Sequence, residues 1–234
     1  MKMRALAAFW LALSAAAQQP EPSWLDPDKS EPAGTKYQSF LSPAIGAPVS
    51  YLIYLPPDYA ASTARYPVVY WLHGLGGNQR GGATFVERLD AAIRAAQSPP
   101  MIAVLVNGMR DSRYVDSFDG KRPVETVIIK DLIPHIDKTW RTIARRDARA
   151  IEGFSMGGFG AARLSFKFPE LFGAVSIMAG ALLDSESVTA SRISPLFEKN
   201  FGSSKAYFQA NSPWVLAHQN AAAVRGRASL RIVC

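Results

Sequence analysis

Cysteine and histidine are scarce in this sequence of 234 residues, and both scarcities limit its chemistry. The only cysteine is Cys234, the last residue, so no disulfide can form within the chain. The three histidines, His73, His135 and His218, show no paired His or Cys spacing, so we predict no metal site. Charged residues make up 19% and hydrophobic residues 48%, which excludes a disordered or membrane-embedded chain.

The positive charge is modest and does not predict a nucleic-acid partner. The formal net charge is +7, and it falls by two, to +5, without Lys2 and Arg4 of an expected leader. Four arginines cluster in mid-chain, but Asp147 interrupts them and no aromatic residues are interleaved. We interpret these four as a solvated face beside a buried strand: Arg141, Arg145, Arg146 and Arg149.

The N-terminus has the order of a targeting segment. Positive charge in residues 1–4 precedes an apolar run, Ala5–Ala16, that is too short to span a bilayer, and small residues follow. We therefore expect a signal peptide over residues 1–17 and a secreted or periplasmic protein without stable membrane insertion; the alternative is an N-terminal helix of the domain. Residues 18–36, rich in Pro, Glu, Asp, Ser and Gly, predict a flexible lead-in to a domain at 37–234.

From residue 37 onward, predicted strands and helices alternate. This order predicts an α/β fold with a mostly parallel sheet and helices on both faces. The pattern loosens between Ala181 and Ser229, where we expect an insertion over the carboxyl edge of the sheet that includes one helix. The expected strands are 49–55, 66–72, 101–106, 148–151, 172–178 and 230–233, and the expected helices are 84–93, 128–140 (bent at Pro134), 156–168 and 212–224.

One pentapeptide, Gly153-Phe154-Ser155-Met156-Gly157, matches the G-x-S-x-G pattern. It lies between an expected strand and an expected helix, which is the context that a nucleophile elbow requires. The glycines permit a sharp turn and a close approach of helix and strand backbones. Ser155 is therefore predicted to be a nucleophile with an exposed hydroxyl at the N-terminus of a helix.

A glycine-rich loop follows the expected strand 66–72. Its sequence is His73-Gly74-Leu75-Gly76-Gly77. Acyl transfer forms a tetrahedral oxyanion, which preorganised backbone N–H groups can stabilise. We expect the amides of Leu75 and Met156 to form this oxyanion hole. The alternative is a phosphate cradle or a plain turn, but the nucleotide-binding glycine patterns are absent, and no cofactor is predicted.

These motifs resemble the putative-esterase group of α/β-hydrolases. That group includes S-formylglutathione hydrolases of the esterase D type, feruloyl esterases, enterochelin esterases and the antigen 85 mycolyltransferases. The resemblance extends over roughly residues 45–234, and it implies carboxylic ester hydrolysis or acyl transfer by a Ser–acid–His triad. We expect substrate contacts from His73, Gly74, Phe154 and Tyr114. Besides the elbow and the loop, it rests on the stretches 54–59, 114–117 and 168–174, of which 114–117 looks most like the feruloyl and carbohydrate esterase branch.

The triad of this family is incomplete in the sequence. Its order is Ser, then acid, then His, and only His218 follows Ser155. We interpret His218 as a surface histidine of the 212–224 helix, His135 likewise as a structural residue, and His73 as part of the oxyanion loop. Asp184 is a fallback acid. The simplest expectation is a chain truncated before its acid, its histidine and its last strand and helix, with little or no activity of its own.

Several functions remain open. The first is a secreted serine esterase that acts on small-molecule or polysaccharide-linked esters. Acyl transfer to a sugar is a second reaction, and a non-catalytic module that binds carbohydrate or protein is a third possibility. The oligomeric state is not predicted. One loop contains three acidic residues, Asp111, Asp116 and Asp119, but it lacks the full calcium-binding pattern. Four aromatic residues could line a pocket for an acyl group: Trp71, Tyr114, Phe154 and Trp214.

Overall fold

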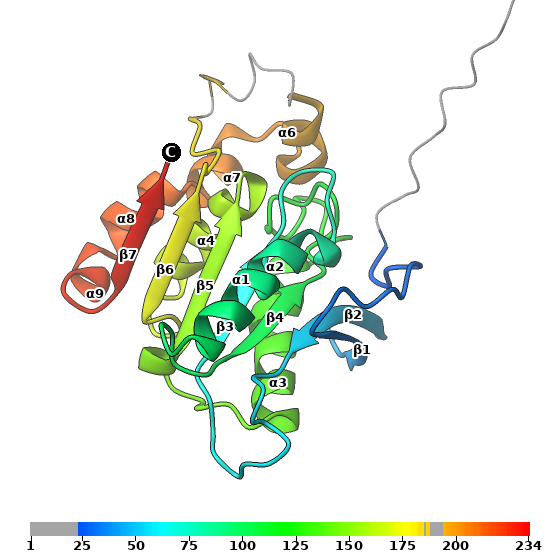
Figure 1. Cartoon of the computed structure of the whole chain (residues 1–234). Coiled ribbons are helices and arrows are strands. Elements are labelled where there is room, and N and C mark those ends of the chain that lie inside the picture. Colours follow the sequence, from blue (N-terminus) through cyan, green and yellow to red (C-terminus); the bar gives the residue numbers. More distant parts are fainter. Residues whose placement is uncertain (1–22, 185, 188–193) are drawn as a thin grey trace, which may run out of the picture.

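Seven strands form one sheet across the part of the chain that the computed structural model describes, residues 23–184, 186–187 and 194–234. The sheet order is β1-β2-β4-β3-β5-β6-β7 (Figure 1). β2 is antiparallel to β1 and β4, and all other neighbours are parallel. The strands are β1 (Thr35–Ser42), β2 (Ala47–Tyr54), β3 (Val68–Leu72), β4 (Ile102–Val106), β5 (Arg149–Phe154), β6 (Ala174–Met178) and β7 (Ser229–Val233).

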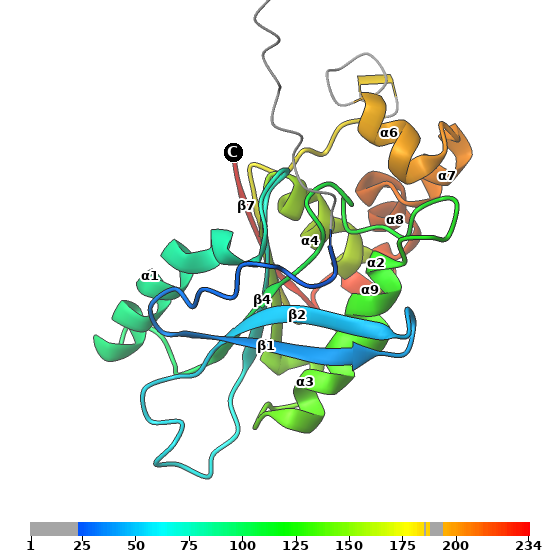
Figure 2. The same ribbon diagram turned by 90° about the vertical axis from the view of Figure 1, so that its right-hand side faces the viewer.

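Helices cover the two faces of the sheet unequally. Figure 2 shows α1 on one face and α2, α3, α4, α8 and α9 on the other. The larger core lies on the α4 side, and a smaller one lies beneath α1. The helices are α1 (Ala83–Arg94), α2 (Val124–Thr126), α3 (Ile133–Thr139), α4 (Met156–Lys167), α6 (Ser194–Phe201), α7 (Lys205–Ala210), α8 (Pro213–Gln219) and α9 (Ala221–Val224), with short turns η1 (Gln79–Gly82) and η3 (Arg146–Ala148).

The mostly parallel sheet with helices on both faces confirms the predicted α/β class. The central strands β3 and β4 are buried along their whole length, as continuous apolar runs in a covered parallel sheet should be. β1 was not predicted. It pairs with β2 as a hairpin across residues 43–46, in which Gly46 has a positive φ of 61°. The pairing is set by the neighbouring strand, because β1 itself buries only part of its length.

The helical stretch around Pro134, where a bend is expected, contains a π-helical turn. Residues Val127–Leu132 (η2) adopt a π-helical turn between α2 and α3. Pro134 has no N–H to donate to the carbonyl four residues earlier, so the regular ladder cannot continue through it. The π-turn directly before this proline therefore accommodates the missing hydrogen bond.

The region between β6 and β7 carries more helices than the one expected. α8 begins at Pro213 with Ser212 before it, as predicted, and α6 and α7 precede it. The helices α6 and α7 lie above the carboxyl edge of the sheet (Figure 1). A third apolar cluster joins them to α4 through four phenylalanines, Phe159, Phe197, Phe201 and Phe208.

The chain before β1 is described from Ser23 onward, and most of its residues up to Gly34 are exposed. The predicted signal peptide lies outside the described residues, and so does the start of the 18–36 lead-in. From Ser23 to Asp28 the chain lies against the sheet, with Asp26 buried. These contacts fix Ser23–Asp28 only, and the flexible lead-in over residues 18–36 stays a prediction. Within the described ranges, every helix is too short or too polar to cross a bilayer.

A buried ion pair ties α4 to α2. Arg163 of α4 is 1% exposed, and its guanidinium donates to the Glu125 carboxylate, the Asn211 side chain and the Tyr114 carbonyl. Lys167 donates to the other Glu125 oxygen at 2.7 Å. Burial raises the pKa of Glu125, but the charges and hydrogen bonds of Arg163 and Lys167 outweigh it, so the net shift is downward.

This ion pair predicts that the folded state loses stability in acid. Because the pKa of Glu125 is lower in the folded state, its contribution is present above the unfolded value of 4.5 and is lost as the pH falls through the folded pKa. We expect Glu125→Gln to lower the free energy of unfolding at pH 7 by about 3 kcal/mol, because it leaves a buried arginine without its counter-charge. In Glu125→Gln, the free energy of unfolding measured by urea titration should also fall less steeply as the pH is lowered below 4.5. The exposed Glu170→Gln is the control; an equal effect of both variants would contradict this role.

Candidate active site

Ser155 occupies a strained turn between β5 and α4. Its φ of 55° and ψ of −112° lie in a region that side chains other than glycine rarely adopt. The turn is fixed from both sides, because the Ser155 N–H donates to the Met178 carbonyl at 2.8 Å and the Ser155 carbonyl accepts from Phe159 at 3.0 Å. Such strain costs about 1–3 kcal/mol and is typical of functional positions. The residue is partly exposed, as an attacking group requires.

The glycines of the elbow are required by close backbone packing. A Cβ on Gly153 would lie 2.0 Å from the Gly157 carbonyl oxygen, and a Cβ on Gly157 would lie 2.0 Å from the Leu72 carbonyl oxygen. Gly158 approaches Gly180 in the same way, at 2.8 Å. The first turn of α4 is thus pressed against the ends of β3 and β5. Any larger side chain would push the helix away and move Ser155 with it.

The glycine loop, residues His73–Gly82, begins beside this serine. Gly74 packs against Phe154 and Ser155, since a Cβ placed on it would lie 3.6 Å from the Ser155 Cβ. The loop and the elbow are therefore on the same edge of the sheet, as parallel β3 and β5 dictate. Leu75 is half exposed next to Gly74. Met156 is the first residue of α4, so its N–H has no acceptor within the helix.

His73 and Tyr114, expected to contact substrate, are both buried beneath this loop. The Tyr114 hydroxyl donates to the His73 carbonyl at 2.9 Å, and its ring fills the space left by Gly108 and Gly160. The His73 Nδ1 lies 2.9 Å from the Gly74 carbonyl. Burial lowers the pKa of His73 to about 4, so the ring is neutral at pH 7. Tyr114 is enclosed by protein, whereas His73, Gly74 and the exposed Phe154 line the same open space, and the substrate contacts of all four residues stay predictions.

The other two histidines lie away from Ser155. His135 stacks on Phe40 and lies 3.1 Å from the Tyr51 hydroxyl, at the β1–β2 end of the sheet. His218 is exposed on α8, two residues before Asn220. The Asn220 side chain donates to the Phe166 carbonyl at 2.8 Å. Phe166 lies roughly 16 Å from Ser155 along α4, at a rise of about 1.5 Å per residue.

The carboxylates considered above as a catalytic acid or as calcium ligands also have local hydrogen-bond or ion-pair partners. Asp184 is exposed and accepts the Ser187 N–H at 2.7 Å, a hydrogen bond that lowers its pKa. Asp116 accepts from Thr126, the last residue of α2. Asp111 pairs with Arg122 and Lys199, and Asp119 accepts from Ser117. No group of three potential metal-ligating side chains comes together among the described residues.

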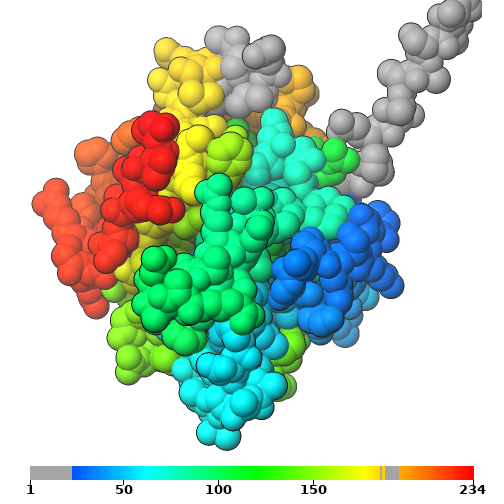
Figure 3. Space-filling model, viewed as in Figure 1, coloured from blue at the N-terminus to red at the C-terminus, as the bar shows by residue number. Residues whose placement is uncertain are grey.

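A groove runs from the elbow along the α1 face of the sheet. Its upper part, about 610 Å³, is bordered by Gly74, Leu75 and Phe154, and its lower part, about 320 Å³, continues along β5, β6 and β7. In the space-filling view the red atoms of β7 stand apart from the green atoms of α1 (Figure 3).

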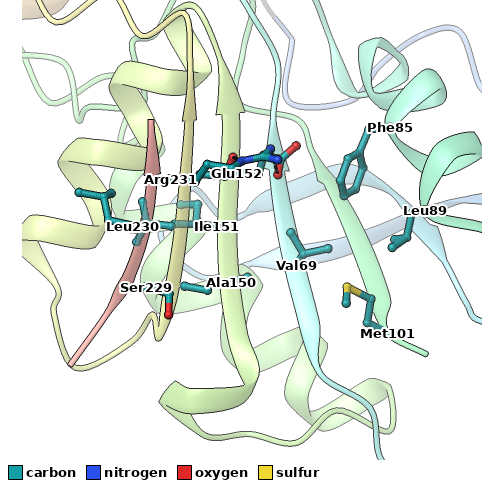
Figure 4. A pocket seen from close by; sticks show the side chains of 13 residues that line it. Val69, Phe85, Leu89, Met101, Ala150, Ile151, Glu152, Ser229, Leu230 and Arg231 are labelled. Carbon is teal, nitrogen blue, oxygen red and sulfur yellow. Dashed lines mark hydrogen bonds and ion pairs between the residues drawn. The ribbon is translucent and has the colours of Figure 1, made fainter. Parts of the chain in front are cut away.

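Glu152 and Arg231 meet within this groove at 3.3 Å (Figure 4). Burial raises the pKa of Glu152, although Arg231 and a hydrogen bond from Ser176 oppose the shift. Of the aromatic set expected around an acyl group, Trp71 is buried in the floor and Trp214 is exposed on α8, donating to the Leu182 carbonyl. The set does not form one pocket wall.

The sequence matches the family described as "Putative esterase" over residues 42–234. The chain belongs to this family. Its fold agrees, since a ferulic acid esterase superposes with a TM-score of 0.64 at 21% identity, covering 85% of this chain and 89% of the other. An S-formylglutathione hydrolase from Agrobacterium tumefaciens superposes with a TM-score of 0.67 at 18% identity, covering 85% and 86%. The fold is therefore the α/β-hydrolase fold of these esterases.

Two relatives in sequence have esterase names and are longer than this chain. An esterase of Mycobacterium tuberculosis is 38% identical over 147 residues, which are 62% of this chain and 32% of the relative. An endo-1,4-beta-xylanase/feruloyl esterase of Xylanibacter ruminicola is 32% identical over 162 residues, 64% of this chain and 22% of the relative. This esterase-family chain thus spans about a third or less of the length of these two proteins.

The packing of the elbow gives a direct test. Gly157→Ala should lower the free energy of unfolding by about 1–3 kcal/mol, because its methyl group would overlap the Leu72 carbonyl. Gly81→Ala is the matched control, since its added Cβ meets its nearest neighbour at an ordinary 3.4 Å, and we expect a change below about 0.5 kcal/mol. Urea unfolding of both variants measures the difference. Equal stabilities would show that α4 can move away from β3 without loss.

Proposed function

We propose that this chain carries the nucleophile and the oxyanion hole of a serine-type carboxylic ester hydrolase, with Ser155 as the nucleophile. The observation that supports it best is the strained, partly exposed Ser155 with the glycine loop packed against it. Strain held in place by hydrogen bonds on both sides of one serine is hard to explain as packing alone. Membership of an esterase family adds to the same reading.

The reaction would proceed in two steps. The Ser155 Oγ attacks the ester carbonyl carbon as its proton leaves to a base, and the carbonyl oxygen becomes an oxyanion. The Leu75 and Met156 N–H groups would stabilise that oxyanion. Collapse expels the alcohol, which takes up a proton, and leaves an acyl group on Ser155. Water then repeats the attack, and the acid and free Ser155 are formed.

The base is the part of this chemistry that the described side chains do not supply. His73 is buried and neutral, and His135 and His218 lie away from the elbow. A serine without a base is a weak nucleophile, and in a serine hydrolase loss of the base costs about a million-fold in turnover. We therefore propose that residues 1–234 alone react slowly with esters. A non-catalytic module that binds carbohydrate or protein is the second candidate, and this separation of histidines from Ser155 favours it.

The substrate class is proposed from the names of the relatives, and the location from the sequence of residues 1–17. We propose feruloyl or acetyl esters on carbohydrate as the substrate class, with the open groove beside Phe154 receiving the acyl or sugar part. A sugar hydroxyl in place of water would make the same acyl-enzyme an acyltransferase. The signal-like residues 1–17 lead us to propose secretion or a periplasmic location.

Replacement of the serine tests the proposal. A fluorophosphonate probe should label the full chain slowly and only at Ser155, because its phosphorus takes the place of the ester carbonyl carbon. Ser155→Ala should abolish this labelling and any p-nitrophenyl acetate hydrolysis above buffer. Added imidazole should raise the Ser155-dependent rate, since it supplies an external base.

The control is Ser165→Ala, which removes a buried hydroxyl of α4 whose partner is the Ala162 carbonyl. It should leave labelling unchanged. Labelling retained in Ser155→Ala would place the nucleophile elsewhere. A folded wild-type chain that resists the probe even with imidazole would favour the non-catalytic module.

A further inference from the structure

The N-terminal segment, Ser23–Asp28, is tied to the sheet by buried polar contacts. The Asn107 side chain, just after β4, donates to the carbonyls of Ser23 and Trp24 at 3.1 and 2.9 Å. The Ser50 hydroxyl of β2 accepts the Asp26 N–H at 2.9 Å. This arrangement fixes the segment at the carboxyl edge of β4, beside the glycine loop.

The same segment binds the far end of the glycine loop. Arg80 of η1 donates to the Asp26 carboxylate at 2.7 Å and to the Asp28 carbonyl at 2.6 Å. Both side chains are largely buried, at 22% exposed for Arg80 and 6% for Asp26. The second Asp26 oxygen accepts the Asp28 N–H at 3.1 Å. The carboxylate is therefore held in one orientation by the chain around it.

A second contact joins the loop to this network. Gln79, the residue before Arg80, is fully buried, and its side-chain oxygen accepts from the Ser50 hydroxyl at 3.1 Å. Ser50 also accepts from Asn107. The loop end is thus anchored by the buried Arg80–Asp26 ion pair, by the longer contact of Arg80 with the exposed Asp28 carboxylate at 3.4 Å, and by the Gln79–Ser50 hydrogen bond. All of these involve the N-terminal segment or the groups that hold it.

The near end of the loop is held differently. The Gly76 N–H donates to the Arg110 carbonyl at 2.7 Å, and the Arg110 Nε donates back to the Gly76 carbonyl at 3.2 Å. Leu75 lies between this contact and Gly74, which packs on Ser155. The Leu75 amide is therefore held between Gly74 and the Arg110 contact at Gly76, and the Asp26–Arg80 pair fixes the loop four residues beyond that contact.

We propose that Asp26 is a positioning residue for the oxyanion hole: its ion pair with Arg80 fixes the glycine loop so that the Leu75 N–H faces Ser155. This inference rests on the proposed function for its chemical meaning. Asp26 does not touch the reacting atoms, and it acts through Arg80 and the loop. Residues ahead of β1 thereby control the geometry of a site formed after β3 and β5.

Amide hydrogen exchange tests the positioning without any chemistry. In Asp26→Asn, the loop amides of Gly76, Gly77 and Gly81 should exchange about tenfold faster or more, as expected for loss of a charge-assisted hydrogen bond. Amides of α4 and β6 should keep their rates. Asp26→Glu, which retains the charge, should restore slow exchange in the loop.

The fluorophosphonate probe supplies the second measurement. In Asp26→Asn, the maximal labelling rate at Ser155 should fall about tenfold, while the probe concentration for half-maximal rate stays the same, because the loop stabilises developing charge and not the bound probe. Asp26→Glu should recover the rate. Asp90→Asn is the matched control, since it removes a 2.6 Å ion pair with Arg94 on α1, away from the loop.

The outcomes separate this inference from the proposed function. If the wild-type chain is not labelled, the proposed function fails, and loop exchange in Asp26→Asn still decides whether Asp26 positions the loop. If a folded Asp26→Asn shows wild-type loop exchange and labelling, the positioning role is wrong. Should Asp26→Asn not fold, Arg80→Gln removes the same pair from the loop side. It should give the same faster exchange, and unchanged exchange there would overturn the inference.

Discussion

The site depends on the contact between backbones where α4 meets the sheet. Gly157 lies against the Leu72 carbonyl and Gly153 against Gly157, so helix and strands approach as closely as peptide groups allow. Because β3 and β5 are parallel neighbours, the chain leaves both strands at the same edge. The glycine loop after one and the serine turn after the other are therefore forced together. This close approach therefore explains both the strained backbone of Ser155 and its contact with Gly74.

Much of this arrangement could be read from local sequence. Continuous apolar runs predict β3 and β4, and the glycine spacing around Ser155 predicts the turn and the helix after it. The anchors of the glycine loop could not be read in this way. Asp26 and Arg80 are separated by 54 residues, and nothing near Asp26 distinguishes it from other acidic residues of a Pro-rich segment. Such pairs are chosen by tertiary structure, and a single sequence carries no signal for them.

Two of the residues predicted to contact substrate, His73 and Tyr114, are buried, and of these only His73 lines the groove. His73 and Tyr114 lie under the loop as a hydrogen-bonded support, with the imidazole kept neutral by its surroundings. In the proposed function, backbone amides and a helix terminus would stabilise the charge that develops next to Ser155. Fixed dipoles of this kind act only when their directions are held, which makes the loop supports as important as the loop itself.

The strand β7 has a consequence for how residues 1–234 behave in solution when they are prepared by themselves. β7 is exposed at every residue and forms the edge of the described sheet, with Leu230, Ile232 and Val233 among its five residues. Edge strands are usually kept from pairing with other chains by a free charge in their middle. Here the central residue is Arg231, and Glu152 of the same molecule already neutralises it. Concentrated samples of residues 1–234 by themselves should therefore self-associate through this edge, and more so as salt screens the remaining positive charge.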